Sequence, residues 1–599
     1  MPRVLNEREI ADFLLEDIPS DGESVCSVEP DEDDNNDGSQ SMMVLGDIPP
    51  ELQPEVDDGF TSDDDVPLSN LVLPSTSASH NQTEVVKPKW KRHYKMEEPS
   101  EYIGGGGVPT NIIDLENVTP TQLFRMFWSE DLVEIICFQT NLYATQKGTP
   151  YTPTTPEEIE VFLALNLVMG IKKMPSYKNY WSSAPDLHDP YISSFMPLNR
   201  FGWLLNNLHL NDSNMMPNKT AANYDKLYKV RPLLDILQRN FDNNYYASEK
   251  VAIDESMIKF KGRNYLKQYM PKKPIKREYK VWMKCAESGY SLDFDIYTGK
   301  EGDKVQVDLG GKVVRQFCED LKYKNHKVFF DNYFNSYSLQ VDLRKDNVLA
   351  CGTVNSNRKN LPKLKDDKDL SRGQYDYRVS NTNVAVLKWK DKRSVFILTN
   401  YIDPTKAGVV TRRERNGDRT EVACPEAVMQ YNSCMNYVDK FDQLKSTYAI
   451  DRKSHKWWHR IFFHFLDCAV VNAFLVYKEI QKEHHPQLDQ LDTKDFRRSV
   501  YQGILAPAQA KNGKHSRRSL SGSGPSSPLP VLIKRHKPSV PTELRTENNM
   551  HQPERSTSRR CAKCSTKRSP ARTVWQCSTC KVPLCIRKDK TCFVDFHKK

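Results

Sequence analysis

The chain has 599 residues, of which 38% are hydrophobic and 27% are charged. Its mean hydropathy of −0.67 is low for a globular protein, so part of the length is expected to stay unfolded. No apolar run approaches ~18 residues, which argues against a membrane-spanning protein. The first residues also lack the basic start and apolar core of a secretory signal.

The net charge of +8 conceals a strong asymmetry. Met1–Val86 holds 22 acidic and 2 basic side chains, whereas the rest of the chain holds 84 basic and 56 acidic ones, a net charge of +28. A body this basic predicts a polyanionic partner, most commonly nucleic acid. The alternative is a surface charged only for solubility.

Composition and residue pattern divide the chain into six segments. The first is too polar to offset its chain entropy, and the two linkers are rich in Lys and Arg. The segments are an acidic disordered tail (1–86), a basic linker (87–114), a helical domain (115–249), an α/β core (250–482), a basic flexible linker (483–550) and a cysteine-rich unit (551–599).

In the helical domain, Gln122–Leu142 has apolar residues at helical spacing. A second helix is expected to start at Thr155-Pro156-Glu157-Glu158, where a capping residue precedes proline and two acids. The apolar run that follows predicts a buried helix.

The α/β core alternates short apolar runs with helical patterns, which predicts a mixed sheet. Strands are expected at 250–258, within 279–297 as a pair, at 327–330, 348–354, 384–389 and 394–400. Helices are expected at 313–321, 337–347, 425–444 and 457–481.

Four carboxylates in this core are candidate metal ligands. Asp254 and Asp331 lie in or directly after apolar strands, and Asp439 and Asp442 share one face of a helix. Carboxylate oxygens that converge in this way suit Mg²⁺ or Mn²⁺. The alternative for any one of them is a cap or a turn, because spacing alone does not show that they meet.

Four sequence blocks, in order, resemble those of the piggyBac transposase family: DESMIKFKGR, FFDNYFNS, CGTVNSNRK and NYVDKFDQL. The resemblance runs from about Asn111 to Lys599. It implies an α/β fold in which an RNase H-like catalytic core with an insertion is flanked by a helical dimerisation and DNA-binding domain and a small C-terminal zinc-binding domain. It also implies a homodimer that acts on double-stranded DNA at transposon ends and joins them to TTAA targets.

The resemblance implies that Asp254, Asp331 and Asp439 are the metal-binding catalytic triad and that Asp442 is an additional catalytic acid. Phosphodiester cleavage and strand transfer would use Mg²⁺ or Mn²⁺ and no organic cofactor. Two departures from the family blocks stand out. Asn436 and Tyr437 replace the two glycines before the third Asp, and Asn355 replaces an Arg.

Basic and aromatic residues near the carboxylates are candidate DNA contacts. Lys259–Lys284 carries ten basic side chains and one acid, which favours phosphate binding over a merely solvated hairpin. One tryptophan of the Trp457–Trp458 pair is expected to stack on a base and the other to pack in the core. The candidates are Lys259, Lys261, Arg263, Lys272, Lys273, Lys276, Arg277, Arg358, Lys456, Trp457 and Trp458.

Six of the 14 cysteines lie between Cys561 and Cys592, and the other eight are scattered. This distribution fits a reducing compartment, here expected to be the nucleus, and a metal-binding unit. Seven candidate ligands with CxxC pairs predict two structural Zn²⁺ ions: Cys561, Cys564, Cys577, Cys580, Cys585, Cys592 and His597. The resemblance to the family implies His551 as the eighth ligand.

Three functions remain open from the sequence. The first is an active transposase, and the second is a domesticated relative that binds specific DNA without catalysis. The third is a chromatin adaptor that uses the zinc unit and the acidic tail.

Overall fold

The computed structural model describes residues 87–518 and 551–598, with short gaps at 116–117, 149, 261, 263, 265, 270–276, 300–307, 415–416, 453, 455, 567–568 and 588–590. The expected acidic tail and residues 519–550 of the expected second linker lie outside the described residues. So do five candidate DNA contacts and the side chain of a sixth, Arg277. The five are Lys261, Arg263, Lys272, Lys273 and Lys276.

Helices fill residues 110–243. They are α2 (Thr110–Ile113), α3 (Pro120–Phe127), α4 (Glu130–Gln146), α5 (Pro156–Ile171), α6 (Pro190–Phe195), α7 (Leu198–Asn207) and α8 (Arg231–Asn243). As expected, Thr155 caps α5 by accepting from the Glu158 N–H. The single helix expected over Gln122–Leu142 is instead α3 and α4, because the backbone leaves the helical region at Trp128, whose ring is buried against Phe462.

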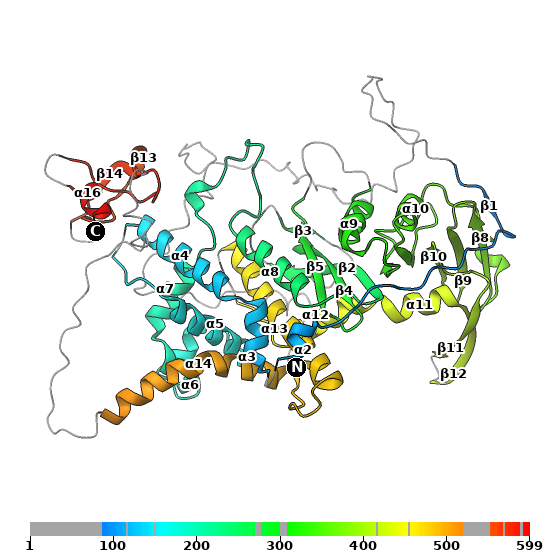
Figure 1. Cartoon of the computed structure of the whole chain (residues 1–599), viewed down its shortest axis with the longest axis horizontal. Coiled ribbons are helices and arrows are strands. Elements are labelled where there is room, and N and C mark those ends of the chain that lie inside the picture. Colours follow the sequence, from blue (N-terminus) through cyan, green and yellow to red (C-terminus); the bar gives the residue numbers. More distant parts are fainter. Residues whose placement is uncertain are drawn as a thin grey trace, which may run out of the picture. The chain divides into compact units, whose positions relative to one another are not determined.

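A ten-stranded mixed sheet follows (Figure 1). Its order is β1-β8-β9-β10-β7-β6-β2-β4-β3, with β5 also paired to β4. Strands β2, β6 and β7 are parallel, and the other pairs are antiparallel. The bounds are β1 (Trp90–Lys91), β2 (Lys250–Lys259), β3 (Gln268–Tyr269), β4 (Arg277–Ala286), β5 (Ser291–Ile296), β6 (Lys327–Phe330), β7 (Leu349–Thr353), β8 (Tyr375–Ser380), β9 (Ala385–Lys390) and β10 (Ser394–Thr399).

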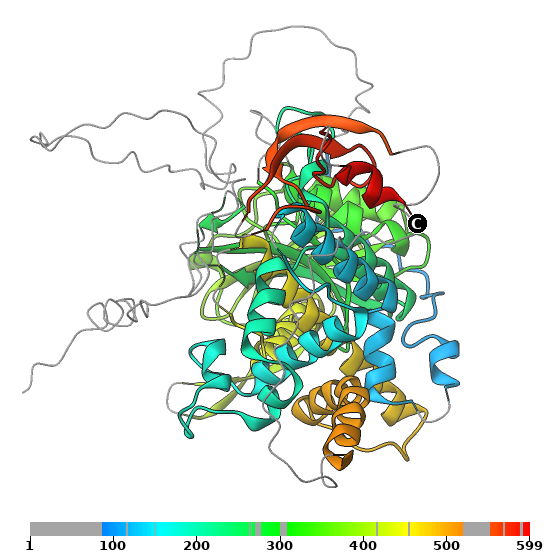
Figure 2. The same ribbon diagram turned by 90° about the vertical axis from the view of Figure 1, so that its left-hand side faces the viewer.

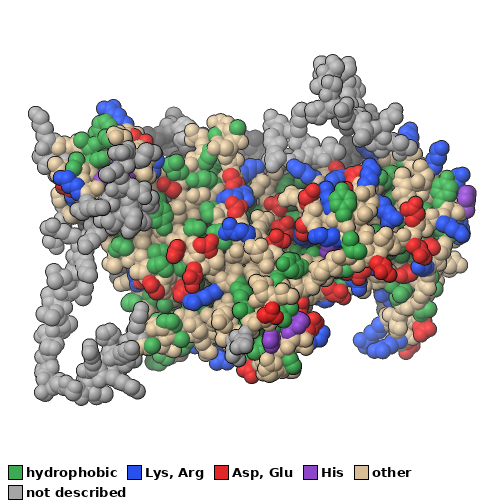
Figure 3. All heavy atoms as spheres, in the orientation of Figure 1, with side chains coloured by type: hydrophobic (Ala, Val, Ile, Leu, Met, Phe, Trp, Pro, Cys, Tyr) green, Lys and Arg blue, Asp and Glu red, His purple; other side chains and the backbone are tan. Residues whose placement is uncertain are grey.

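Two helices, α9 (Leu309–Phe317) and α10 (Tyr337–Lys345), connect β5, β6 and β7. A separate hairpin, β11 (Ala407–Arg413) with β12 (Arg419–Pro425), follows β10 and projects beyond it (Figure 1). Lys and Arg side chains gather at its tip (Figure 3). Its residues alternate between exposed and half-buried, so no apolar run marked it in the sequence.

The segment expected to be a linker at residues 87–114 is ordered along the core. Its strand β1 pairs with β8, and the Trp90 indole donates to the Asn360 carbonyl at 2.8 Å. Further along, the Gly107 N–H donates to the Tyr246 carbonyl at 3.0 Å, at a backbone φ of 95° that favours glycine. Backbone hydrogen bonds, rather than apolar burial, hold much of this segment.

Four helices complete the core: α11 (Glu426–Cys434), α12 (Tyr437–Thr447), α13 (Trp457–Glu483) and α14 (Thr493–Arg518). The helix expected over 425–444 is divided into α11 and α12 at Met435–Asn436. Among the described helices, α13 is the one long and apolar enough to cross a membrane, yet 94% of its apolar window is buried inside the protein. Figures 1 and 2 show α14 beside α3.

The C-terminal unit contains β13 (Pro553–Arg560), β14 (Arg572–Cys577) and α16 (Cys592–His597). Strands β13 and β14 form an antiparallel pair with an irregular register between Arg555 and Arg559. Such a short unit has few apolar residues with which to form a core.

A buried ion pair joins α13 to α14. The Arg497 guanidinium donates to Asp467 at 2.8 Å, and both side chains are 3% exposed. The same arginine donates to the Leu167 carbonyl of α5, and Asp467 accepts the Ile450 N–H just after α12. This ion pair therefore connects α5, α13 and α14 with the loop that follows α12.

We expect Arg497→Met to lower the free energy of unfolding by about 3–5 kcal/mol, because it leaves the Asp467 carboxylate buried and unpaired. Urea unfolding followed by tryptophan fluorescence measures this change. The neighbouring Arg498→Met, at a half-exposed side chain, should cost less than about 1 kcal/mol. Equal losses in the two variants would contradict the role given to Arg497.

Candidate metal centres

Asp254, in the middle of β2, lies beside Asp331, which directly follows the end of the parallel strand β6. In the pairing of β2 with β6, Ile253 lies opposite Phe330. Asp254 and Asp331 are the next residues along the chain, so they also lie opposite each other. Burial, together with the negative charge of Asp331, raises the pKa of Asp254 from 3.8 to about 7. Burial also raises the pKa of Asp331. Two half-buried carboxylates that repel each other are suited to bind a cation.

Asp439 reaches the same place from α12. This helix packs on β2 and β4, and its N-terminal half lies over the β4–β5 turn, where a Cβ on Gly289 would lie 3.4 Å from the Lys440 Cβ. Asp439 is exposed in the first turn of α12, and its charge contributes to the raised pKa of Asp254. The structure therefore places Asp254 and Asp331 on adjacent strands, with Asp439 on the helix packed against β2 and close enough for its charge to act on Asp254.

Asp442, one turn further along α12, is engaged by protein groups. Its Oδ1 accepts from the Ser256 hydroxyl at 2.7 Å and from the Lys445 ammonium at 2.6 Å. The fourth carboxylate thus has a cation from the protein beside it.

Two further side chains fix the surroundings of Asp331. Arg358, a candidate DNA contact, donates to the carbonyls of Asn332 and Tyr333 at 3.1 and 2.9 Å and so supports the loop after Asp331. Asn355 accepts from the Asn332 amide at 3.2 Å. Sequence reasoning noted both positions but not that they hold this loop.

The departure at Asn436 and Tyr437 is accommodated within the fold. Helix α12 begins at Tyr437, and its ring is 1% exposed in the core. The bulky residue therefore packs beneath the start of the helix instead of disrupting it.

The described candidate DNA contacts differ in exposure. Lys259 is exposed at the end of β2. Lys456 donates to the Asn206 carbonyl at 2.8 Å, and its ammonium lies 5.6 Å from the Trp458 ring centre. Trp458 is 1% exposed and packs against His209, so it has no ring face free for a base, whereas Trp457 is half-buried. Trp458 is thus the member of the pair that packs in the core.

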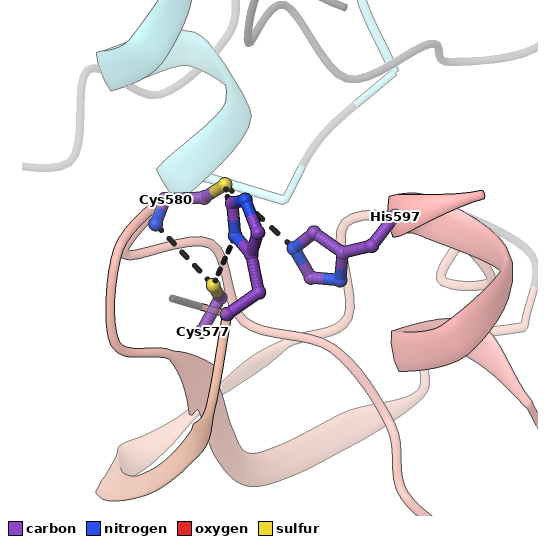
Figure 4. Close-up of side chains that lie close together, drawn as sticks. Cys577, Cys580 and His597 are labelled. Atoms are coloured by element: carbon purple, nitrogen blue, oxygen red, sulfur yellow. Dashed lines mark hydrogen bonds between the residues drawn. The ribbon is translucent and has the colours of Figure 1, made fainter. Parts of the chain in front are cut away.

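The C-terminal unit assembles two four-residue clusters. One contains His551, Cys577, Cys580 and His597, and the other contains Cys561, Cys564, Cys585 and Cys592. Within each, the ligand atoms lie within 4.8 Å of one another. The labelled Cys577, Cys580 and His597 point toward one another (Figure 4), with Cys580 Sγ 3.7 Å from His597 Nε2.

The donor sets fit two different kinds of metal. Four Cys or His ligands at this separation suit tetrahedral Zn²⁺, and Nδ1 of His597 lies 2.8 Å from the Phe593 carbonyl, which turns Nε2 toward the cluster. The three aspartates offer only oxygen, which suits Mg²⁺ or Mn²⁺. The two Cys and His clusters thus fit Zn²⁺, and the three aspartates fit Mg²⁺ or Mn²⁺.

Comparison with known proteins gives consistent relatives. The family model described as Transposase IS4 matches residues 119–474. Human PiggyBac transposable element-derived protein 2 is 28% identical over 455 residues, 74% of this chain and 75% of that protein. Human PiggyBac transposable element-derived protein 3 is 25% identical over 636 residues, 100% of both.

A solved structure has a similar fold. It is the cryo-EM structure of a piggyBac transposase synaptic complex with hairpin DNA, with a TM-score of 0.60 and 22% identity over 74% of this chain and 92% of that one. At this identity the likeness concerns the fold alone. It agrees with a mixed α/β architecture built on a large central sheet.

The carboxylate cluster should destabilise the protein when no Mg²⁺ or Mn²⁺ is added. The folded protein holds the Asp254 proton more tightly than the unfolded chain does, so stability falls as pH rises from 3.8 to about 7. We expect Asp331→Asn, which removes a like charge, to raise the melting temperature at pH 8 by about 1 °C, which corresponds to about 1 kcal/mol for a folded part of this length. The gain should shrink at pH 5.

Differential scanning fluorimetry at both pH values measures this effect, with the exposed Asp366→Asn as the control. A gain of equal size at the two pH values, or one shared by the control, would contradict charge repulsion as the cause.

Proposed function

Because this chain belongs to the piggyBac transposase family, we propose that it is a metal-dependent DNA transposase whose catalytic residues are Asp254, Asp331 and Asp439. The observation that carries the proposal is the convergence of these carboxylates from β2, β6 and α12. Neither strand register nor helix packing requires three like charges to meet, so their meeting favours a functional site.

The proposed core is RNase H-like. Its strand order β5-β4-β2-β6-β7, with β4 antiparallel to β2, supports this assignment. The strands β8–β12 stand between β7 and α11 and would form the insertion. This arrangement puts Asp254, within β2, and Asp331, directly after β6, in the middle of the sheet.

In the proposed reaction, Asp254, Asp331 and Asp439 would hold Mg²⁺ or Mn²⁺, and the bound metal would supply activation of the attacking water or 3′-hydroxyl and stabilisation of the leaving oxygen. The chain's own residues position this site. Arg358 fixes the loop after Asp331, and α12 presents Asp439 from above the sheet. Burial on β2 excludes water from one side of Asp254 and strengthens its attraction for a cation.

Double-stranded DNA is the proposed substrate. The net charge of +28 beyond the acidic tail supports phosphate binding. Lys259, at the exposed end of β2, lies five residues from Asp254. The proposal extends, through the family, to transposon ends joined at TTAA, a homodimer that pairs two ends, and action in the nucleus.

A catalytically silent, DNA-binding derivative is the second candidate. The names of the human relatives, transposable element-derived proteins, favour it. The presence of all three carboxylates in one place favours an active enzyme instead.

Strand nicking tests the choice between the two. We expect purified full-length protein to nick a TTAA-flanked transposon end only when Mg²⁺ or Mn²⁺ is present. Asp254→Asn or Asp331→Asn should reduce the rate at least about 100-fold, because each removes a charged metal ligand. The exposed Asp366→Asn serves as the matched control.

DNA binding measured by gel shift under the same conditions separates the candidates. Binding without nicking by the wild type would support the silent derivative. Equal nicking by wild type and both aspartate variants would eliminate the assigned site.

We further propose that the C-terminal unit holds two structural Zn²⁺ ions, one in each cluster. Metal analysis should find about two zinc ions per chain. Cys564→Ser should lower this number and unfold the unit, because so small a unit depends on ligation for its folding energy. The neighbouring Ser565→Ala, outside both clusters, should keep both ions. Full zinc content in Cys564→Ser would refute the ligand set.

A further inference from the structure

The buried Lys445 and Ser256 form a polar cluster with the half-buried Asp442, where α12 packs on β2. Lys445 is 8% exposed, and its ammonium lies 2.6 Å from Asp442 Oδ1 and 3.3 Å from the Ser256 hydroxyl. The same Oδ1 accepts from Ser256 at 2.7 Å. Each of the three side chains therefore contacts the other two.

The position of this cluster matters for the carboxylate site. Ser256 stands two residues after Asp254 on β2, so both side chains point to the same face of the sheet. Asp442 stands one turn after Asp439 on α12, so these two share a helix face. A tie between Asp442 and Ser256 therefore sets where Asp439 lies along β2.

The tolerance for error is small. Sliding α12 along β2 by one turn would move Asp439 by about 5.4 Å, whereas a carboxylate oxygen must lie about 2.0–2.1 Å from a bound Mg²⁺. Hydrophobic packing alone permits slippage of this kind, because it is not directional. A charged hydrogen bond between defined partners prevents such slippage, because it is lost when the helix moves.

We propose that Lys445 is a positioning residue of the carboxylate site: it holds Asp442 against Ser256, which places Asp439 opposite Asp254 and keeps Asp442 from acting as a fourth metal ligand. This inference rests on the proposed function. It assigns Asp442 a structural and electrostatic role beside the triad.

Metal selectivity follows from this assignment. Mg²⁺ is usually held by one or two carboxylates and keeps several waters, whereas Ca²⁺ accepts six to eight oxygen ligands. Loss of Lys445 would release a fourth negative charge beside the triad. The site should then bind divalent cations more tightly, favour Ca²⁺ relative to Mg²⁺ and position Asp439 less well.

The test compares full-length wild type with Lys445→Met, Lys445→Arg and the exposed control Lys482→Met. Mn²⁺ binding is measured by electron paramagnetic resonance, with competition by Ca²⁺ and Mg²⁺, and nicking is measured in Mg²⁺. We expect Lys445→Met to bind Mn²⁺ about tenfold more tightly, since one charge at several ångströms is worth that much. It should also nick at least about tenfold more slowly, and Lys445→Arg should restore both values toward wild type.

Asp442→Asn keeps the inference testable if Lys445→Met does not fold. An amide at this position still accepts from Lys445 and Ser256, and the loss of one charge at several ångströms should weaken Mn²⁺ binding by about tenfold. A loss of about 100-fold or more would show that Asp442 is a ligand and would overturn the inference.

The failure of this inference is distinct from failure of the proposed function. A folded Lys445→Met protein with unchanged Mn²⁺ affinity, Ca²⁺ preference and nicking overturns the inference alone. A wild-type protein that neither binds Mn²⁺ nor nicks overturns both.

Discussion

The parallel pairing of β2 with β6 is the constraint on which the rest of the structure depends. It matches Ile253 with Phe330 and so sets two carboxylates beside each other in the middle of the sheet. A shift of one residue in this register would turn Asp254 to the opposite face, because side chains alternate along a strand. The buried residues Val251, Ala252, Val328 and Phe329 fix that register. Apolar packing therefore supplies the energy that holds mutually repelling charges together.

The surrounding helices convert this pairing into a complete site. Helix α13 is buried nearly all round and packs on β2 and α12, so it forms the floor on which α12 rests. Directional contacts then fix the position of α12. In the middle of the helix, Asp442 accepts from Ser256 on β2, and beyond the end of the helix Asp467 accepts the Ile450 N–H. Arg497 extends this support to α5 and α14. Charged groups buried in pairs here define positions that apolar contacts alone leave free.

Much of the core could be predicted because its strands are short apolar runs that end in polar residues. The expected strand at 327–330 is β6, and the expected helix at 457–481 is α13 with two more residues. The errors arose where tertiary contacts override local pattern. Trp128 turns out of a helical stretch to reach Phe462, and the hairpin β11–β12 has no apolar signature.

The site itself shows the same division. The sequence predicted Asp254, Asp331 and Asp439 as site residues, because they lie in motifs that resemble those of the transposase family. It did not reveal that Asp442 and Lys445 both bond Ser256 or that Arg358 turns to the backbone after Asp331, because these contacts join residues 25 or more apart in sequence. The local sequence thus shows where charged residues lie along the chain. Contacts with residues distant in sequence determine the surroundings of each one in the fold.

The two kinds of candidate metal centre relate to stability in opposite ways. The carboxylates lie in a core that apolar residues hold together, so the core folds around them despite their repulsion. The cysteine-rich unit has little core, and its two ligand sets alternate along the chain: His551 precedes Cys561, and His597 follows Cys592. Each set therefore encloses residues of the other. If each cluster binds zinc as proposed, neither centre could open without loosening the loops that carry the other, and the ions and the unit's fold would form one cooperative system.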